Sequence, residues 1–597
     1  MTLVQGRAAD IEGDVADRGP EVGARVAVAH PRSDQLLLSP DITPKVANRA
    51  HGALWLGLAP VVPLVQPATG DRRQSIKERV RRSLSVSSLA PPAALGVVLA
   101  LQAWDSVRLI RSNSAFLDEA TYLGAGHRLW QTFLHGGPNL HFPNYFSGAP
   151  VVYPILGAAA DSIGGLTAAR SLSLSFMLIA TVLVYASARR LYGRWAGPLA
   201  AAAFVTVEAS LFLGALATFD ALSLTLIALA TWIVIRAGTS PGTQPNGTLY
   251  LAAPVIVAAN ATKYASTIFD PVVLAIAFVL VASSHRWRTA LRVVSIQLGI
   301  IVGLSAALLA LGGTAYISGI SSTTLFRAPG FTPPSRVLHD SISWVGGLAV
   351  LASVAAIGLV VQAARTHQGR TRAALGVVLV MAVFLAPINE ARIHTTTSLN
   401  KHVGFGAWFG AIVVGSLATA VRGRRFNVLS WRPWPRHIRV WPVAACAVVL
   451  MALVPMYVSG RNQATYEFHT WLDSETFLQR IKPLVQHTTG PILLDDAEVP
   501  DYYVGGGVRA TRWHDTYYLS YRPPGFSRRL VGIPAYTAAI LNHYFTIVAL
   551  DFGAQHRIDA AIVKSMTWSH AYRFVTRVPV SDVFGHSVYV IWRLRSA

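Results

Sequence analysis

Long apolar segments follow one another through the middle of this sequence, from about residue 89 to residue 458. Eleven of them lie at about 89–109, 167–188, 196–216, 219–236, 249–262, 267–283, 293–311, 342–362, 373–388, 403–421 and 440–458. A helix needs roughly 20 apolar residues to cross the hydrocarbon core of a bilayer. Only 13% of the residues are charged, whereas about 25% are charged in soluble proteins. We therefore expect a mainly α, polytopic α-helical membrane protein with about 11 spans.

The positive charges fall mostly in alternate loops, which predicts an orientation. If the basic run at 71–82 is cytoplasmic, the loops on that side hold 22 Lys and Arg, and the outer loops and outer helix ends hold 8. Cytoplasmic loops collect Lys and Arg. We expect an integral plasma (inner) membrane protein with a cytoplasmic N-terminus and an extracytoplasmic C-terminal domain. The net charge of +22 then reflects topology, so no nucleic-acid partner is expected.

Three parts of the chain follow from this pattern. Residues 1–82 are expected to be a disordered, basic-ended cytoplasmic tail, because their apolar stretch at 53–65 is short and interrupted by prolines. Residues 83–458 form the transmembrane domain, with long outer loops at 110–166 and 312–341 and a short polar one at 389–402. Residues 459–597 contain buried-strand patterns at 491–496, 545–551 and 588–592 with helical patterns between them. We expect a small α/β domain there.

The first outer loop carries two adjacent carboxylates, Asp118 and Glu119, immediately after the first span. A partly dehydrated carboxylate at the membrane surface can have a raised pKa and act as a general base. The alternative is that both residues only favour the start of an interfacial helix, where negative charge is stabilising. The residues alone leave these two interpretations equally open.

Several motifs occur in a fixed order, and all of them except a basic patch lie on the expected outer side. They are Leu117-Asp-Glu-Ala-x-Tyr122, the Pro-containing stretch 145–154, Gly165-Leu-Thr-Ala-Ala-Arg170, the basic patch 188–194, Ala217-Thr-Phe-Asp220 and Asn260-Ala-Thr-Lys263-Tyr264. This series resembles the GT-C glycosyltransferases, specifically the family-39-like group of protein mannosyltransferases and lipid A aminoarabinose transferases. The resemblance covers residues 88–300 and the plan of a C-terminal outer domain.

The resemblance implies a function and a set of site residues. It implies transfer of a sugar from a polyprenyl-phosphate donor to an envelope glycan, lipid or protein on the outer face. Asp118 would be the general base, with Glu119 beside it and Asp220 in the substrate site. A donor phosphate also needs cations near the interface. The candidates are Lys263, Arg327, Arg392, Lys401 and His402, for which snorkelling or lipid-headgroup contact is the alternative.

One departure from the family pattern concerns the donor phosphate. The aminoarabinose transferases have a Glu-Lys pair before the paired prolines of the juxtamembrane stretch, whereas this sequence has Ser147 and Gly148. Another cation must supply the missing positive charge, or the chemistry differs. Neither subgroup's acceptor can be carried over to this chain.

Few ionisable residues lie within the spans, and each should face protein or a polar cavity. They are Arg170, Glu208 and Asp270. Glu208 is expected either to reach the same cavity as Asp220 or to pair with Arg170.

No cofactor is expected, although a divalent metal stays an open alternative. His127, His135 and His141 share the first outer loop, but their spacing matches no compact ligand pattern. The single cysteine, Cys446, excludes a cysteine zinc cluster. In the outer domain, Trp513-His-Asp515 and Gly505-Gly-Gly507 are interpreted as surface loops.

Two other functions compete with glycosyl transfer. A transporter or flippase of lipid-linked glycans should show repeat symmetry and polar residues near the middle of the membrane. The sequence instead concentrates polar residues at one face and shows no internal repeat. A non-catalytic GT-C scaffold is the third possibility, supported only by the missing Glu-Lys pair.

Overall fold

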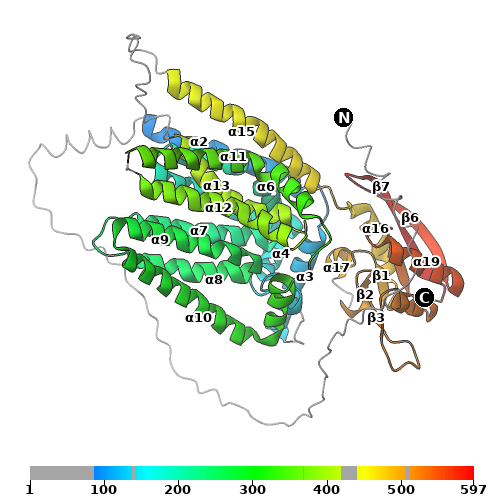
Figure 1. Cartoon of the computed structure of the whole chain (residues 1–597). Helices are drawn as coiled ribbons and strands as arrows, with labels where there is room; N and C mark the ends of the chain where they lie inside the picture. Colours follow the sequence, from blue (N-terminus) through cyan, green and yellow to red (C-terminus); the bar gives the residue numbers. More distant parts are fainter. Residues whose placement is uncertain (1–85, 137–141, 367–368, 419–439, 506–509, 597) are drawn as a thin grey trace, which may run out of the picture. The chain divides into compact units, whose positions relative to one another are not determined.

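The computed structural model describes residues 86–136, 142–366, 369–418, 440–505 and 510–596 (Figure 1). The expected N-terminal tail, 1–82, and most of the basic loop after residue 421 lie outside the described residues. The membrane part is helical throughout. Its helices are α2 (Val86–Ile110), α3 (Leu117–His135), η1 (Phe142–Asn144), α4 (Tyr153–Tyr192), α5 (Ala196–Val205), α6 (Glu208–Ala215), α7 (Phe219–Gly238), η2 (Gly247–Leu251), α8 (Ala252–Thr262), η3 (Tyr264–Phe269), α9 (Asp270–Ser284), α10 (Trp287–Ile320), η4 (Ser321–Leu325), α11 (Pro334–Thr366), α12 (Arg370–Arg392), α13 (Leu399–Gly415) and α15 (Val440–Glu467).

Each predicted span overlaps one of these helices or a pair of them, which confirms the polytopic helical fold. Among the described residues, seven helices are long and apolar enough to cross a membrane. The pair α5 and α6 makes an eighth if it is one span, although its two halves are bent by 69°. The segment 247–262 and the 17-residue α13 fall below that length. The last predicted span continues as α15 past residue 458 to Glu467.

Helix α4 is longer than the span predicted within it, because two helical segments are joined across a break. The break lies at Gly164 and Gly165, where Gly165 has φ +64°. This left-handed conformation is easily reached only by glycine. The predicted span at 167–188 therefore begins immediately after the break, and the preceding turns of α4 belong to the first outer loop.

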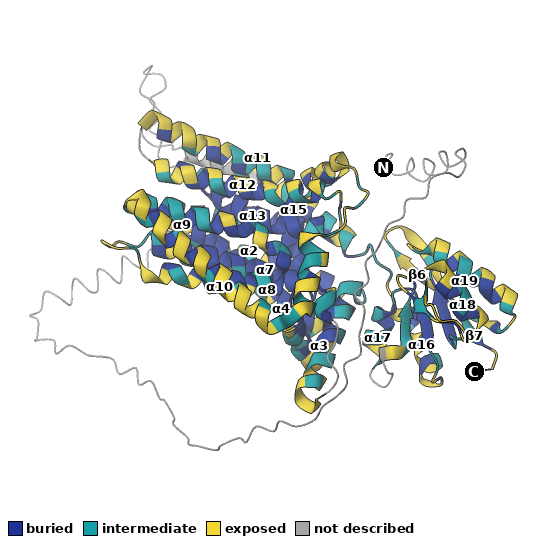
Figure 2. Cartoon of the chain, turned by 60° about the horizontal axis from the view of Figure 1, so that its bottom comes forward, coloured by how far each residue is buried: buried dark blue, intermediate teal, exposed yellow. Residues whose placement is uncertain are grey.

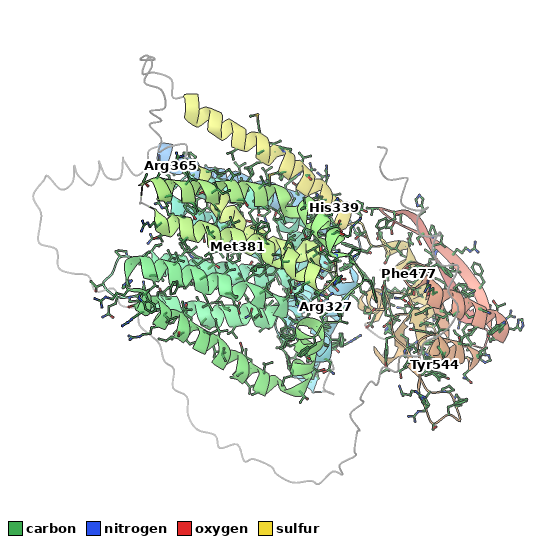
Figure 3. All side chains as sticks on the ribbon, viewed as in Figure 1. Arg327, His339, Arg365, Met381, Phe477 and Tyr544 are labelled. Carbon is green, nitrogen blue, oxygen red and sulfur yellow. The ribbon has the colours of Figure 1, made fainter. Side chains whose placement is uncertain are left out.

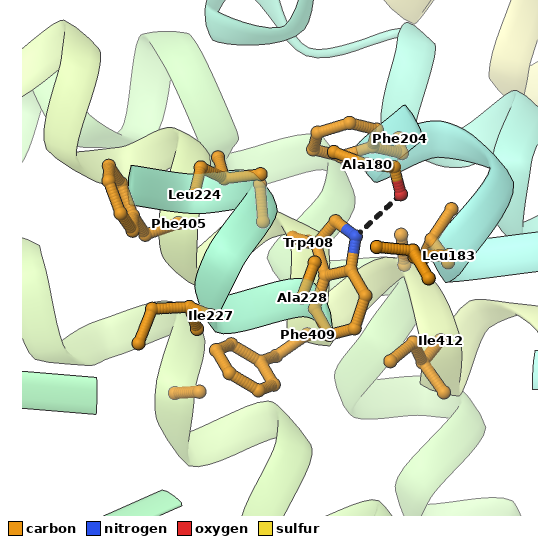
Figure 4. Packing of buried hydrophobic residues seen from close by; sticks show 14 of the residues in the cluster. Ala180, Leu183, Phe204, Leu224, Ile227, Ala228, Phe405, Trp408, Phe409 and Ile412 are labelled. Carbon is orange, nitrogen blue, oxygen red and sulfur yellow. Dashed lines mark hydrogen bonds between the residues drawn. The ribbon is translucent and has the colours of Figure 1, made fainter. Parts of the chain in front are cut away.

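Helix α13 lies at the centre of the bundle, and α10 lies at its surface (Figure 2). Trp408 of α13 is 1% exposed and donates its indole N–H to the carbonyl oxygen of Ala180 at 2.9 Å (Figure 4). Leu224, Ile227 and Phe409 pack around it in the same apolar cluster. Because buried indole N–H groups need an acceptor, this bond fixes the position of α13 relative to α4.

The C-terminal domain contains a mixed five-stranded sheet. The strand order is β2 (Trp513–Asp515), β1 (Ile492–Leu494), β5 (Ile547–Leu550), β7 (Gly585–Leu594) and β6 (Tyr572–Asp582). Strand β1 is parallel to both β2 and β5, while β7 is antiparallel to β5 and β6. Two further short strands, β3 (Ser520–Tyr521) and β4 (Leu530–Val531), form a separate hairpin.

Helices cover both faces of this sheet, so the expected α/β domain is confirmed. They are α16 (Glu475–Gln486), α17 (Glu498–Val504), η6 (Ala510–Arg512), α18 (Ile533–Leu541) and α19 (His556–Ser569). Ile492 and Ile547 pack with α16 on one face, and Leu493 and Val548 pack with α18 and α19 on the other. This alternation is what a strand buried on both faces produces. The predicted strands at 491–496, 545–551 and 588–592 correspond to β1, β5 and β7.

One interpretation of this domain is wrong. Trp513-His-Asp515 is not a surface loop but the edge strand β2, in register with Ile492 to Leu494. Three residues are too few to show a period in the sequence, so only the pairing with β1 reveals the strand. Gly506 and Gly507 of the glycine run lie outside the described residues.

The carboxyl ends of the three parallel strands are acidic. Asp515 ends β2, Asp495 follows β1 and Asp551 follows β5. Burial, together with the neighbouring charge of Asp551, raises the pKa of Asp495 to about 8. Burial raises the pKa of Asp559, in the first turn of α19, to about 7. Carboxyl groups are therefore concentrated and dehydrated at one edge of this sheet.

Charges assigned to opposite sides of the membrane lie at opposite ends of the bundle. Figure 3 labels Arg365 at one end, and Arg327 and His339 at the other.

We expect alkaline phosphatase fused after Arg595 to be active in intact cells, because the C-terminal domain is predicted to be extracytoplasmic. A fluorescent protein at the same place, which matures only in the cytoplasm, is the control. Fluorescence without phosphatase activity would overturn the predicted orientation.

Candidate active site

Asp118 and Glu119 occupy the first turn of α3, which follows α2 after a short loop at 111–116. The backbone N–H of Phe116, the residue before this helix, donates to Oε2 of Glu119 at 2.9 Å. A side chain that returns to the capping residue satisfies one of the unpaired N–H groups at a helix start. One of the two interpretations of these carboxylates is that they stabilise the start of a helix, and Glu119 does so. Asp118 points elsewhere.

Glu119 forms a buried ion pair with Arg170 of α4. The Arg170 Nε and Nη2 atoms donate to Oε1 and Oε2 of Glu119 at 2.8 and 2.7 Å. Oε1 also accepts the backbone N–H of Ala217 at 2.7 Å. The side chains of Glu119 and Arg170 are 0% and 1% exposed. With the bond from Phe116, all four lone pairs of the carboxylate accept a hydrogen bond.

The other donors of Arg170 are used just as fully. They bind the backbone carbonyl oxygens of Ile110, Asn113 and Ser114 at 2.8 to 2.9 Å. Arg170 thus ties the end of α2 and the loop after it to α4. The expectation that Glu208 could be the partner of Arg170 is wrong, because Glu119 and these carbonyl groups occupy the whole guanidinium.

Asp118 pairs with a lysine that lies far away in the sequence. Nζ of Lys401, in the first turn of α13, donates to Oδ2 of Asp118 at 2.8 Å. The Asp118 side chain is 34% exposed, whereas that of Lys401 is only 7% exposed. The ammonium group also lies over the ring of Phe116, 5.3 Å from its centroid. Asp118 is therefore accessible to a substrate while its cationic partner is buried behind it.

A second ion pair lies next to the first. Asp220, at the start of α7, accepts from Lys263, which separates α8 from η3, and both side chains are buried. Thr218 also donates to Asp220, at 3.0 Å. The charges of Asp118 and Lys401 act on Lys263 as well. Two carboxylates and two ammonium groups thus form one balanced cluster, which we call the charge cluster (Asp118, Asp220, Lys263 and Lys401).

The stretch around Ser147 fixes the position of Lys263. The backbone N–H of Tyr264 donates to the carbonyl oxygen of Ser147 at 2.9 Å, and that of Ala149 donates to Ala261 at 2.7 Å. A Cβ atom at Gly148 would lie 2.0 Å from the carbonyl oxygen of Thr262. No side chain fits at this position, so glycine is required for the close approach of the two segments.

Of the two remaining predicted site residues, His402 lies near the charge cluster and Arg392 lies apart from it. His402 is buried and its Nδ1 lies 2.7 Å from Oε1 of Glu390. The charges of Lys263 and Asp220 act on its ring. Arg392, by contrast, is exposed and donates to Asn389 of its own helix at 3.1 Å. The structure brings together Asp118, Asp220, Lys263, Lys401 and His402 but not Arg392.

Tyr122, one turn after Asp118, closes one side of the charge cluster. Its ring packs against that of Phe219, with centroids 4.5 Å apart, and that of Phe146 at 5.1 Å. Burial, reinforced by the charges of Asp118 and Asp220, raises the pKa of its phenol well above the usual range. Tyr122 therefore stays neutral and can act as a hydrogen-bond donor.

The histidines of the first outer loop do not gather into a metal site among the described residues. Nε2 of His127 lies 2.6 Å from Asp161 on α4, which also accepts from Tyr502 at 2.6 Å. His135 is exposed at the end of α3. His141 lies outside the described residues.

The C-terminal domain contributes contacts that the sequence did not indicate. Tyr503 accepts the backbone N–H of Ala115 at 2.9 Å, and Asp501 pairs with Arg128 of α3. A cavity of about 460 Å³ lies beside these contacts, between the end of α2 and α16. It is lined by Arg111, Ser112, Asn113, Ser114, Asp473, Glu475, Leu478, Gln479, Lys482, Tyr503 and Val504. The only sequence signal for this surface is the Asp501-Tyr-Tyr503 run, which has no distinctive spacing.

The structure thus combines a helical bundle, the charge cluster at its end and an appended α/β domain. A family model described as dolichyl-phosphate-mannose-protein mannosyltransferase matches residues 150–311. A comparison with curated protein sequences gives no significant match.

Two solved ArnT structures share the fold. ArnT from Cupriavidus metallidurans in the apo state superposes with a TM-score of 0.54 at 13% identity, over 85% of this chain and 99% of that one. ArnT bound to undecaprenyl phosphate gives 0.51 at 13% identity, over 83% and 97%. Oligosaccharyltransferase AglB from Archaeoglobus fulgidus, in complex with an inhibitory peptide and a dolichol-phosphate, gives 0.49 at 12% identity, over 83% and 74%. The resemblance to the GT-C glycosyltransferases is confirmed, and the chain has their fold.

Proposed function

We propose that this protein transfers a sugar from a polyprenyl-phosphate donor to an extracytoplasmic glycan, lipid or protein, with Asp118 as the general base. The observation that carries the proposal is the pair between Asp118 and Lys401. It places an accessible carboxylate next to a buried ammonium group at the end of the bundle. The ArnT structure with undecaprenyl phosphate supports a donor of this class.

The reaction needs both members of this pair. Asp118 accepts the proton of the acceptor hydroxyl while the acceptor oxygen bonds to the anomeric carbon of the sugar. The bond from that carbon to the phosphate oxygen breaks, and polyprenyl phosphate leaves with the electron pair. Negative charge therefore passes from Asp118 to the leaving phosphate, and ammonium groups near that phosphate stabilise the transition state.

Lys401 couples donor binding to activation of the base. Without donor, its ammonium group neutralises Asp118 at 2.8 Å. The donor phosphate is a phosphodiester with one negative charge, and its oxygens compete with Asp118 for the same ammonium protons. When Lys401 turns toward the phosphate, Asp118 loses its cationic partner and becomes a better proton acceptor.

Lys263 is the cation that takes the place of the lysine missing at Gly148. The two backbone segments touch at this point, and Gly148 leaves no room for a side chain of its own. Lys263 stands next to Gly148 at the contact and is paired with Asp220. The aminoarabinose transferases have the lysine of a Glu-Lys pair at the position of Gly148. In this protein Lys263, on the adjacent segment, supplies the positive charge instead.

The other residues hold this site in place. Glu119 acts as a positioning residue for α3, since its lone pairs are all used. Asp220 orients Lys263, and the buried pair of His402 with Glu390 borders the site. Arg392 has no contact with the charge cluster, so we do not assign it to the donor phosphate. A transporter would need polar groups near mid-membrane, whereas these lie at one end of the bundle.

Binding of undecaprenyl phosphate to the purified protein in nanodiscs tests the proposal. Lys401→Met and Lys263→Met should each weaken this binding more than about tenfold, because each removes a charge-assisted hydrogen bond worth about 1.5–3 kcal/mol. Arg336→Gln, which removes an exposed cation paired only with Asp340 along its own helix, is the matched control and should leave affinity within about twofold. Unchanged affinity in both lysine variants would contradict the proposed donor site.

A further inference from the structure

A cluster of three aspartates in the C-terminal domain lies outside the proposed active site and has no role in transfer. Asp495 follows β1, Asp551 follows β5, and Asp559 belongs to the first turn of α19. One carboxylate oxygen from each lies within 4.8 Å of the other two. These elements come together at the carboxyl ends of the parallel strands β1 and β5, the end of the sheet at which α/β domains commonly bind ligands.

Asp559 lacks the partners that a buried carboxylate requires. It is 0% exposed, and neither of its oxygens accepts a hydrogen bond from any residue that the structure describes. A buried carboxylate without a hydrogen bond or counter-charge is costly. Its oxygens instead lie close to two further carboxylates, an arrangement that a bound cation would stabilise.

Hydrogen bonds hold the side chains of the other two aspartates in place, and each carboxylate keeps free lone pairs that can coordinate a cation. Asp495 accepts from the hydroxyl of Thr516 and, at 2.8 Å, from the backbone N–H of Asp551. Asp551 uses Oδ1 to accept the backbone N–H of Gly553 at 2.7 Å. Each carboxylate offers about four lone pairs. The backbone therefore orients these two side chains toward the cluster without exhausting them.

The distances and the atom types select a class of ion. Oxygen ligands of Ca²⁺ lie about 2.3–2.6 Å from the ion, so two of them are at most about 5 Å apart. The oxygen separations of this cluster satisfy that limit. The three members offer only oxygen, which favours Ca²⁺ or Mg²⁺ over the nitrogen and sulfur sites typical of zinc. Asp551 is only half-buried, which leaves an entry path.

We propose that Asp495, Asp551 and Asp559 bind a hard divalent cation, best matched by Ca²⁺, which joins β1, β5 and α19 of the C-terminal domain. The ion would connect two adjacent parallel strands to the helix that covers them. The site is separate from the charge cluster, so it stabilises the domain and takes no part in bond cleavage.

Cation binding to the full-length protein in nanodiscs, after treatment with a chelator, tests this site. We expect about one Ca²⁺ per chain by isothermal titration calorimetry, and a rise in Tm on addition of Ca²⁺. Mg²⁺ should compete but bind more weakly. Asp559→Asn should weaken Ca²⁺ binding more than about tenfold, since even the loss of residues outside the ligand shell costs 10–100-fold at metal sites.

The behaviour of Asp559→Asn without metal separates this proposal from a purely structural role. The variant removes a repulsive charge, so its metal-free Tm should equal or exceed that of the wild type, while its response to Ca²⁺ disappears. Glu475→Gln, an exposed carboxylate in the first turn of α16, is the control and should respond as the wild type does. If Asp559→Asn does not fold, the half-buried Asp551→Asn takes its place. Absence of binding at about 10 mM Ca²⁺ and Mg²⁺, or an unchanged response in the variant, would overturn the proposal.

Discussion

Replacing Asp118 by Asn should lower kcat for sugar transfer by about 10²–10⁴-fold, the usual contribution of a general base. Asparagine keeps the size and the planar shape of the side chain but cannot take the acceptor proton. Affinity for undecaprenyl phosphate should not fall and should rise slightly, because Lys401 is released from its carboxylate partner. The measurement is single-turnover transfer from a lipid-linked sugar, alongside binding of undecaprenyl phosphate, in nanodiscs.

The split between the two readouts is the decisive feature of this experiment. A residue that only maintains the fold would reduce donor binding and turnover together. Asp340→Asn, which alters another carboxylate near the start of α11, is the control and should leave both unchanged. Transfer by Asp118→Asn at a rate near that of the wild type would exclude Asp118 as the base and leave the fold assignment intact.

The spans could be predicted because each crossing must be apolar over most of its length. Their ends could not, since helices continue into the interface, where polar residues are tolerated. Helix α4 begins at Tyr153, well before the predicted start at 167, and is broken at Gly164 and Gly165, just before that start. The bend between α5 and α6 likewise has no proline at its junction that would mark it in the sequence.

The members of the charge cluster could be named from the sequence, but their pairing could not. Asp118 and Lys401 are 283 residues apart, and only the approach of α3 to α13 makes them neighbours. Charge placement predicted that both lie near the outer face. Which carboxylate faces Lys401 depends on the first turn of α3, where successive residues point in different directions. That turn directs Glu119 into the protein toward Arg170 and leaves Asp118 accessible.

The contacts from the C-terminal domain escaped prediction for a different reason. Tyr503 and Asp501 lie on α17, a helix of seven residues. A helix this short shows no reliable period in a sequence. The long strand β6 was also missed, because its partly exposed pattern lacks the continuous apolar run that identified β1, β5 and β7.

Glu119→Gln should reduce the free energy of unfolding by about 3–5 kcal/mol, the typical cost of removing one partner from a buried ion pair. The change leaves the guanidinium of Arg170 buried without a counter-charge and removes one of the two strong acceptors it binds. Thermal unfolding in detergent, or unfolding by a denaturing detergent, measures the loss. The exposed pair of Arg336 and Asp340 is the matched control: Asp340→Asn should cost no more than about 0.5 kcal/mol.

The double variant Glu119→Gln, Arg170→Gln tests whether the loss comes from the unbalanced charge. Removing both charges should recover part of the stability lost by Glu119→Gln alone. Recovery should be incomplete, because the carbonyl oxygens of Ile110, Asn113 and Ser114 would lose the donors that Arg170 supplies. If the free energy of unfolding of Glu119→Gln lies within about 1 kcal/mol of the wild-type value, this ion pair does not stabilise the loop between α2 and α3. Asp118 must then be positioned chiefly by Lys401 and the packing of α3.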